Sequence, residues 1–299
     1  MASGCPQSDL SRRTGSSRPE LSHMKIAVLS GKGGTGKTTV AASLASLLPD
    51  ADYIDCDVEE PNGFLFLSPD LSLHDSVTVP VPEVDPALCT MYGACVRACQ
   101  FNALAAVGSR IMVFPDLCHH CGACLIACKP GAICEIDQVI GQIDRSADGH
   151  FRQGVLRTGQ PVGLPIIDRL IREADPDHLS ILDAPPGSSC PVVHVLRSAD
   201  YALLVTEPTP FGLHDLKMIV SLVRDLSLPA GVVINKSNGT DLIIDSFCRQ
   251  ENLPVLARIP FSRDIAVRYS RGYLPIDPDS PWRPLFNGLA ERIRKETDR

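Results

Sequence analysis

The sequence predicts a parallel α/β fold that is interrupted by a small cysteine-rich insertion. Apolar strand-like runs alternate with amphipathic helical runs from residue 24 onward, which is typical of βαβ units. A glycine-rich turn follows the first run, and eight of the twelve cysteines lie between residues 89 and 134. Proline-rich flanks separate this segment from the alternating pattern. We therefore expect two α/β parts, 24–77 and 137–299, around an insert at 78–136.

Composition and charge exclude several classes of protein. Hydrophobic residues make up 44% of the 299 positions, which is enough to close a core. Asp and Glu (35) outnumber Lys and Arg (28), and the net charge of −7 has the wrong sign for a protein that neutralises nucleic-acid phosphates. No apolar run approaches the roughly 20 residues that span a bilayer, and the N-terminus lacks the apolar stretch of a secretory signal. We expect a cytoplasmic protein without nucleic-acid or membrane partners.

The elements follow one another in a regular order. Residues 1–23 are rich in Ser, Arg, Gly and Pro without a hydrophobic period, so we expect a disordered leader. The predicted strands are 25–30, 52–57, 138–144, 151–159, 179–187, 201–207, 230–237 and 254–260, and the predicted helices are 38–48, 165–175, 192–198, 211–226 and 240–250. A last amphipathic helix around 282–293 is expected to pack on its own domain.

The glycine-rich turn matches a phosphate-binding loop. Residues 31–38 read GKGGTGKT, which fits G-x-x-x-x-G-K-S/T between a strand and a helix. Backbone N–H groups of such a loop converge on phosphate oxygens, the Lys37 ammonium interacts with the β and γ phosphates, and the Thr38 hydroxyl can ligate Mg²⁺. The nucleotide-binding residues predicted here are Gly31, Gly33, Gly34, Thr35, Gly36, Lys37, Thr38 and Thr39.

Carboxylates at the ends of two other strands complete the expected nucleotide site. Asp183 ends an apolar strand, where it can reach Mg²⁺ directly or through water. Gly187 lies just beyond it and can respond to the γ phosphate through backbone movement. Asp57 follows the second strand at the same sheet edge and is a candidate for orienting the attacking water. Asp55 ends the same strand, and Asp55 and Asp57 can each instead be an ordinary turn residue.

The insert carries a bacterial ferredoxin run of cysteines. Cys118, Cys121, Cys124 and Cys128 follow the spacing C-x2-C-x2-C-x3-C, in which the fourth cysteine ligates the other cluster of a pair. A single zinc ion fits four cysteines this close together poorly, although it remains an alternative. The last cysteine of the earlier run, Cys99, would by the same rule join the first three cysteines of this run. One complete 4Fe–4S set therefore consists of Cys118, Cys121, Cys124 and Cys99.

The earlier half of the insert departs from this pattern. It supplies Cys89, Cys95 and Cys99, but Tyr92 stands at the second cysteine position. The second set, Cys89, Cys95 and Cys128, is therefore incomplete, and we expect a three-iron cluster, an open-coordinated cubane or no cluster there. Cys134, in the short run ICEI, is expected to be a buried core residue rather than a replacement ligand.

The phosphate loop resembles the deviant Walker A loop of the MinD, ParA and nitrogenase iron protein group, because Lys32 adds a lysine near its start. The resemblance implies that Lys32 reaches the nucleotide of a partner chain in an ATP-dependent homodimer, or in a heterodimer with a paralogue. It also places Asn235 where an adenine-reading residue is expected. With the insert, the chain resembles MinD superfamily ATPases that contain an inserted ferredoxin domain.

This resemblance implies an ATP-hydrolysing dimeric switch coupled to an iron–sulfur module. The implied output is electron transfer or metal-centre assembly on a redox or apo-metalloprotein partner. Two alternatives stay open: an iron–sulfur carrier or scaffold with ATP-gated release, and a MinD-like spatial regulator. The expected cofactors are ATP, Mg²⁺ and one 4Fe–4S cluster, with the second cluster incomplete or absent.

Overall fold

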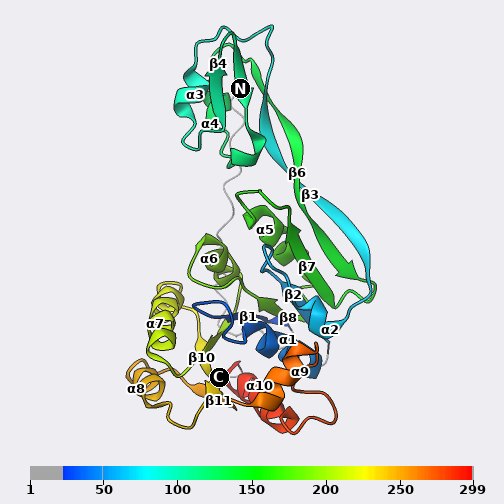
Figure 1. Cartoon of the computed structure of the whole chain (residues 1–299), viewed down its shortest axis with the longest axis vertical. Coiled ribbons are helices and arrows are strands. Elements are labelled where there is room, and N and C mark those ends of the chain that lie inside the picture. The colour runs from blue at the N-terminus through cyan, green and yellow to red at the C-terminus, as the bar shows by residue number, and fades with distance from the viewer. Residues whose placement is uncertain (1–22, 49, 298–299) are drawn as a thin grey trace.

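A nine-stranded, mostly parallel sheet organises the protein (Figure 1). The computed structural model describes residues 23–48 and 50–297, so the predicted leader lies outside the described residues except for His23. The strand order is β11-β10-β9-β1-β8-β2-β7-β6-β3. The strands are β1 (Lys25–Leu29), β2 (Ala51–Asp55), β3 (Leu71–Val84), β6 (Ile133–Ser146), β7 (Phe151–Leu156), β8 (Leu179–Asp183), β9 (Tyr201–Thr206), β10 (Ala230–Ser237) and β11 (Val255–Pro260). The α/β fold with its mostly parallel sheet is confirmed.

Helices cover both faces of this sheet, and each face has its own hydrophobic core. The helices are α1 (Lys37–Leu47), α2 (Phe64–Leu67), α5 (Leu164–Arg172), α6 (Cys190–Arg197), α7 (Pro210–Asp225), α8 (Leu242–Gln250), α9 (Arg263–Ser270) and α10 (Arg283–Thr297). Residues of α1 and α10 form the core of one face. Residues of α5, α6, α7 and α8 form the core of the other. Alternate strand residues face opposite sides, so both faces of the central strands are buried.

The C-terminal helix α10 packs on its own domain, as expected. Phe286, Leu289 and Ile293 are fully buried against α1 and the sheet. Trp282 lies just before the helix and donates its indole N–H to Asp264 at 3.0 Å. In the described part of the chain, no helix combines the length and the apolar character needed to cross a bilayer.

Two long antiparallel strands, β3 and β6, form a ribbon that carries the cysteine module away from the sheet (Figure 1). Each strand has 14 residues, which corresponds to roughly 46 Å at 3.3 Å per residue. The module contains α3 (Ala94–Ala98), β4 (Leu104–Val107), β5 (Arg110–Val113), a 3-10 turn (Pro115–Leu117) and α4 (Ala123–Ala127). The predicted insert boundaries, 78 and 136, fall inside this ribbon, so the insert continues strands of the main sheet.

The continuous ribbon was not expected from the sequence. Pro80 and Pro82 were interpreted as flanks of the insert, yet both lie within β3. Proline lacks a backbone N–H, and β3 tolerates it because this strand is at the edge of the sheet and needs hydrogen bonds on one side only.

Ion pairs and tight packing hold the base of the ribbon on the sheet. Arg145 of β6 forms ion pairs with Asp75 of β3 and with Glu173 at the end of α5. A Cβ atom on Gly154 of β7 would lie 2.5 Å from Ile166, so α5 rests directly on the backbone of β7. The ribbon and the sheet therefore form one packed unit at this end.

We predict that Ile143→Ala lowers the free energy of unfolding by about 2–5 kcal/mol, because it removes a fully buried side chain of β6 and leaves a cavity in the main core. Ile136→Ala on the same strand is the matched control, since Ile136 is 45% exposed. Chemical denaturation of both variants measures the difference. Equal stability of the two variants would contradict the packing described for β6.

Candidate nucleotide site and cysteine module

The phosphate loop connects β1 to α1 at the carboxyl edge of the sheet. Gly36 has φ = 90°, a left-handed conformation that favours glycine, and a Cβ atom there would lie 2.2 Å from Nδ2 of Asn235. A Cβ on Gly31 would lie 2.3 Å from Cβ of Asp215. Both glycines are therefore required by close approach of neighbouring segments, independently of any ligand.

A buried ion pair joins the loop to the end of β8. The Lys37 ammonium donates to Oδ1 of Asp183 at 2.5 Å, and the Tyr53 hydroxyl donates to the other oxygen at 2.8 Å. Burial lowers the pKa of Lys37, but the Asp183 carboxylate outweighs it, so that the net shift is upward. Lys37 is 7% exposed and Asp183 is fully buried. The lysine is thus held charged, next to the carboxylate predicted to bind Mg²⁺.

Two more carboxylates lie close to this pair. Burial raises the pKa of Asp55 to about 7, and the charge of Asp183 adds to the rise. The carboxylate of Asp55 accepts N–H groups of Asp57, Asn62 and Gly63, so it organises the loop after β2. Burial likewise raises the pKa of Asp57 to about 6, while Lys37 opposes the shift.

Lys32 lies at the exposed side of the loop. Its ammonium is 3.4 Å from Glu207, and its side chain is 40% exposed. Glu207 also pairs with Lys236 at 2.6 Å, and Lys236 donates to the carbonyl of Gly34 at 2.9 Å. Glu207 therefore bridges two lysines beside the phosphate loop.

The remaining predicted residues lie around the same loop. The Gly187 N–H donates to the Ser30 carbonyl at 2.9 Å, which connects the loop after β8 to the start of the phosphate loop. Asn235 of β10 donates its side-chain N–H to the Thr35 carbonyl at 2.6 Å. Gly33, Gly34, Thr35, Thr38 and Thr39 form the rest of the turn and the first helical residues of α1. The structure thus brings the nucleotide-site residues named from the sequence to one edge of the sheet.

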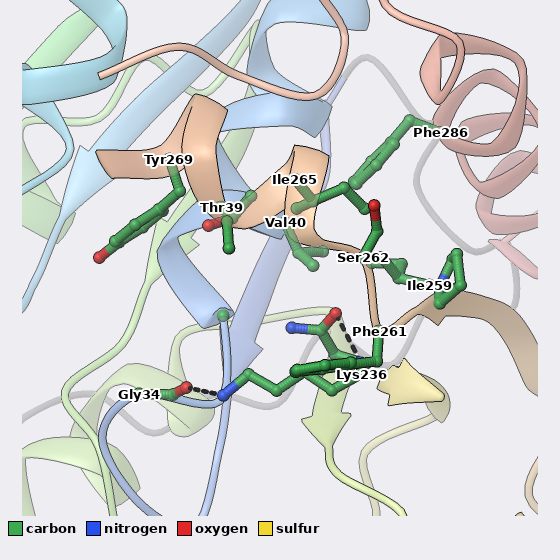
Figure 2. Close-up of a pocket in the computed structure, with 14 residues that line it drawn as sticks. Gly34, Thr39, Val40, Lys236, Ile259, Phe261, Ser262, Ile265, Tyr269 and Phe286 are labelled. Atoms are coloured by element: carbon green, nitrogen blue, oxygen red, sulfur yellow. Dashed lines mark hydrogen bonds between the residues drawn. The ribbon is translucent and has the colours of Figure 1, made fainter. Parts of the chain in front are cut away.

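A cavity of about 270 Å³ opens beside the loop (Figure 2). Thr39 and Val40 of α1 line one wall, Ile265 and Tyr269 of α9 line another, and Phe261 follows β11. Asn235 and Lys236 complete it. The lining is mostly apolar with a few polar groups, which is typical of a pocket for a flat aromatic ligand.

Sequence analysis did not single out Glu207, Phe261 or Tyr53. Glu207 and Phe261 each directly follow the carboxyl end of a parallel strand, β9 and β11 respectively. Ligands of open α/β sheets collect at that edge, so strand ends gave a usable signal for these two residues. Tyr53 lies inside β2, and only the three-dimensional structure shows that it contacts Asp183.

In the module, the cysteines gather into the two sets expected from crossed pairing. Burial raises the pKa of the Cys95 thiol, and the neighbouring Cys128 and Cys89 thiols add to the rise. These three cysteines line one small pocket. The complete set comprises Cys99, Cys118, Cys121 and Cys124: burial raises the pKa values of the Cys118 and Cys124 thiols, and charge effects from the other members contribute.

As they lie in the structure, the sulfur atoms of these cysteines are too widely spaced to hold a single zinc ion. Four thiolates around one Zn²⁺ would lie roughly 3.8 Å apart. Among the described residues, no three of these cysteines have sulfur atoms that all lie within 4.8 Å of one another. A cubane binds each cysteine to a different iron and so needs wider spacing. Backbone N–H groups of Ala103 and His120 donate to the sulfurs of Cys99 and Cys118, so both sulfurs already accept hydrogen bonds.

Tyr92 and Cys134 differ in their surroundings. Tyr92 is 60% exposed, lines the pocket of the incomplete set and lies under the guanidinium of Arg97 at 5.2 Å. Cys134 lies in β6 as expected, but it is exposed, so the prediction that it is a buried core residue is wrong. The reason is that its strand segment belongs to the projecting ribbon, where residues 134–137 of β6 are all exposed.

The fold and the loop geometry define a nucleotide-binding protein of the P-loop class. Residues 26–276 match the family described as the CobQ/CobB/MinD/ParA nucleotide binding domain. The chain therefore belongs to this family, and its fold is that of a MinD-like P-loop NTPase.

Similar proteins extend this comparison. The uncharacterized protein MJ0579 of Methanocaldococcus jannaschii is 33% identical over 261 residues, which cover 83% of this chain and 90% of that protein. The iron-sulfur cluster carrier protein of Methanococcus maripaludis is 23% identical, over 91% of this chain and 86% of that protein. The septum site-determining protein MinD of Pyrococcus horikoshii, solved with Mg-ADP, is similar in fold, with a TM-score of 0.54, 19% identity and coverage of 90% and 95%.

We predict that the nucleotide-free protein loses stability between pH 4 and pH 7 partly through Asp57. Its pKa is raised in the folded state from 3.8 to about 6, so the folded protein binds more protons than the unfolded one in this window, and stability falls as pH rises. Asp57→Asn should flatten the fall between about pH 4 and pH 6. Thermal melting across this range tests it, with Asp70→Asn at an exposed position as the control. An unchanged slope in Asp57→Asn would contradict the raised pKa.

Proposed function

We propose that this protein is an ATP-hydrolysing switch whose nucleotide state controls an iron–sulfur module, for electron transfer or for metal-centre assembly on a partner protein. The observation that carries the proposal is the continuous sheet. β2 leads into the Asp57 loop, β7 pairs with β2, and β6 of the ribbon pairs with β7. The nucleotide edge and the cysteine module are thus joined through hydrogen-bonded strands.

The nucleotide site supplies each function that phosphoryl transfer requires. Lys37 binds the phosphates, Thr38 and Asp183 hold Mg²⁺, and Asp57 orients the attacking water. The cavity beside Asn235 takes the base. The Mg-ADP complex of the Pyrococcus horikoshii MinD, which shares the fold, supports this assignment.

Lys32 acts across a dimer in this proposal. Its ammonium lies at the exposed side of the loop and is held by Glu207 within a single chain. Dimerisation on ATP, between two copies or with a paralogue, transfers this charge to the partner's nucleotide. Hydrolysis then depends on assembly of the dimer, because the partner's lysine adds a positive charge to the one that Lys37 supplies at the transferred phosphoryl group.

The module binds a 4Fe–4S cluster through Cys99, Cys118, Cys121 and Cys124. Such a cluster supplies one-electron transfer when bound. The cysteines lose their protons on ligation, and the N–H groups directed at Cys99 and Cys118 stabilise the resulting thiolates. The N–H of Leu156, at the end of β7, donates to the Val58 carbonyl at 2.8 Å, so movement of the Asp57 loop is transmitted to the strand beside the ribbon.

A carrier function is the second candidate, and the incomplete set favours it. Cys89, Cys95 and Cys128 leave one coordination position to the exposed Tyr92, so that a cluster held there is labile. Similarity to the iron-sulfur cluster carrier protein of Methanococcus maripaludis points the same way. Loss of cluster to an apo acceptor on addition of ATP would favour delivery, whereas retained clusters that change oxidation state would favour electron transfer.

Coupling is tested by paramagnetic resonance spectra of the anaerobically purified, reduced protein with and without Mg-ATP. We expect the cluster signal to shift on addition of nucleotide. Lys37→Ala should keep the cluster and lose the shift, because it removes the phosphate-binding charge far from the module. The proposal would be refuted if the wild-type spectrum did not change on addition of nucleotide, or if the purified protein contained no iron.

We predict that Lys37→Ala abolishes ATP binding, whereas Lys32→Ala keeps binding and loses hydrolysis by at least about 10³-fold, the magnitude typical of a transition-state cation supplied in trans. The two lysines lie on one loop, which makes each variant the control for the other. Nucleotide affinity by calorimetry and phosphate release give the two readouts. Normal ATP hydrolysis by the Lys32→Ala variant would contradict the proposed role of Lys32 at the nucleotide of the partner chain.

We predict that Cys121→Ala removes the 4Fe–4S signal, because it deletes one of the four ligands of the complete set. Tyr92→Cys should raise the iron content per chain if the adjacent set holds a three-iron centre, since it restores the missing thiolate. Iron and sulfide analysis measures both. Unchanged iron in Tyr92→Cys would contradict a three-iron centre at that set.

A further inference from the structure

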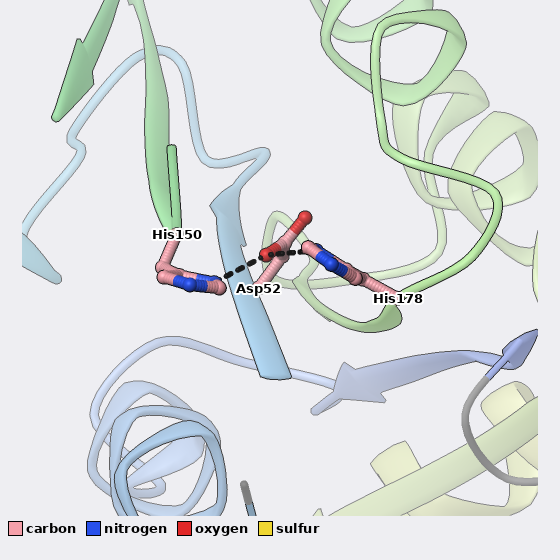
Figure 3. Close-up of side chains that lie close together, drawn as sticks. All are labelled: Asp52, His150 and His178. Atoms are coloured by element: carbon pink, nitrogen blue, oxygen red, sulfur yellow. Dashed lines mark hydrogen bonds and ion pairs between the residues drawn. The ribbon is translucent and has the colours of Figure 1, made fainter. Parts of the chain in front are cut away.

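Three metal-ligating side chains converge at the sheet edge opposite the nucleotide loops (Figure 3). Asp52 lies near the amino end of β2, while His150 and His178 immediately precede β7 and β8. β2 runs between these two strands, with Tyr53 in register with Phe151 and Asp52 in register with Ser180. Parallel pairing thus places one ligand on each of three neighbouring strands.

The ligand atoms point at one place. Oδ1 of Asp52 is 2.9 Å from Nδ1 of His150 and 3.3 Å from Nδ1 of His178, and each of the three residues offers one ligand atom within 4.8 Å of the other two. The two imidazole rings are stacked with centroids 5.5 Å apart. The side chain of Asp52 is 1% exposed, and those of the histidines are 42% and 37% exposed, so the cluster is anchored inside and open to solvent on one side.

Zinc–nitrogen and zinc–oxygen bonds of 2.0–2.2 Å place the ligand atoms of a tetrahedral site roughly 3.3–3.6 Å apart. The separation of Asp52 from His178, 3.3 Å, matches this range, and the separation from His150, 2.9 Å, is slightly shorter, so a small outward movement of His150 makes room for a single ion. The surroundings also contain unsatisfied polar atoms: within the described residues, Oδ2 of Asp52 and Oγ of Ser180 are buried without a hydrogen-bond partner. Arg152 approaches Oδ2 only as an ion pair at 3.9 Å.

We propose that Asp52, His150 and His178 bind one divalent transition-metal ion of the zinc class. Two imidazoles and one carboxylate suit Zn²⁺ and its first-row neighbours, whereas Mg²⁺ and Ca²⁺ prefer all-oxygen sites. The remaining coordination positions face the solvent side and take water. The ion ties β7, β2 and β8 together at their amino ends, and it is independent of the nucleotide and cluster proposals.

The test is zinc titration of the full-length, cluster-loaded protein under anaerobic conditions after chelator treatment. We expect one equivalent of Zn²⁺ to bind and the melting temperature to rise. Affinity should fall at least about tenfold in His150→Ala, His178→Ala and Asp52→Asn. His74→Ala is the matched control, because His74 also pairs with a carboxylate, Asp144, at 2.7 Å but belongs to no three-ligand group among the described residues.

X-ray absorption at the zinc edge separates this site from the cysteines. The proposal requires nitrogen and oxygen neighbours near 2.0–2.1 Å, whereas binding to cysteine gives sulfur near 2.3 Å. The half-exposed His178 can be truncated without opening the core, so His178→Ala keeps the test valid if Asp52→Asn does not fold. Sulfur ligation, no bound equivalent, or equal affinity in wild type and His178→Ala would overturn the proposal.

Discussion

The ion pair between Lys37 and Asp183 is the interaction on which the nucleotide edge depends. Both groups are buried, and removal of one partner from such a pair typically destabilises a protein by about 3–5 kcal/mol. In the proposed cycle both charges must acquire new partners together, phosphate for the lysine and a cation for the carboxylate. Asp55 and Asp57 lie beside the pair; burial is the main cause of their raised pKa values, the charge of Asp183 adds to the rise, and Lys37 opposes it. In the proposed cycle a cation that enters with the nucleotide would favour the ionised form of these carboxyl groups.

In the proposed coupling, the sheet is the path from the nucleotide site to the cysteine module at the far end of the ribbon. The Asp57 loop follows β2, and the next strand outward, β7, leads on to β6 through antiparallel pairing. Coupling requires an element that can adopt two conformations. We infer that the loops after β2 and β8 are these elements, because only a few hydrogen bonds, from Asn62 to Asp55 and from Gly187 to Ser30, hold them in place.

The sequence predicted the features whose signals lie within short segments, and it missed those that depend on contacts between distant segments. The phosphate loop and the strands after it were predictable because motif and hydrophobic period lie within short segments, and the cysteine spacing indicated the crossed sets. The continuous ribbon was missed because pairing of β3 with β6 joins segments on either side of the whole module, and Pro80 and Pro82 favoured a break. The histidine cluster left no local signal, since His150 and His178 are 98 and 126 positions from Asp52.

The lysines at the phosphate loop differ in burial, and this difference sets the order of the steps in the proposed cycle. Lys32 and Lys236 share Glu207; burial raises the pKa of Glu207, but the two lysines outweigh it and lower the pKa overall. Both lysines are partly exposed, and exposed ion pairs are worth only about 0–1 kcal/mol, so release of Lys32 to another chain requires little energy. Lys37 is buried together with Asp183, and it can leave this ion pair only when another negative charge, such as a phosphate, takes the place of the carboxylate. In the proposed cycle, nucleotide entry at Lys37 is therefore the demanding step, and the transfer of Lys32 across a dimer would follow with only a small change in free energy.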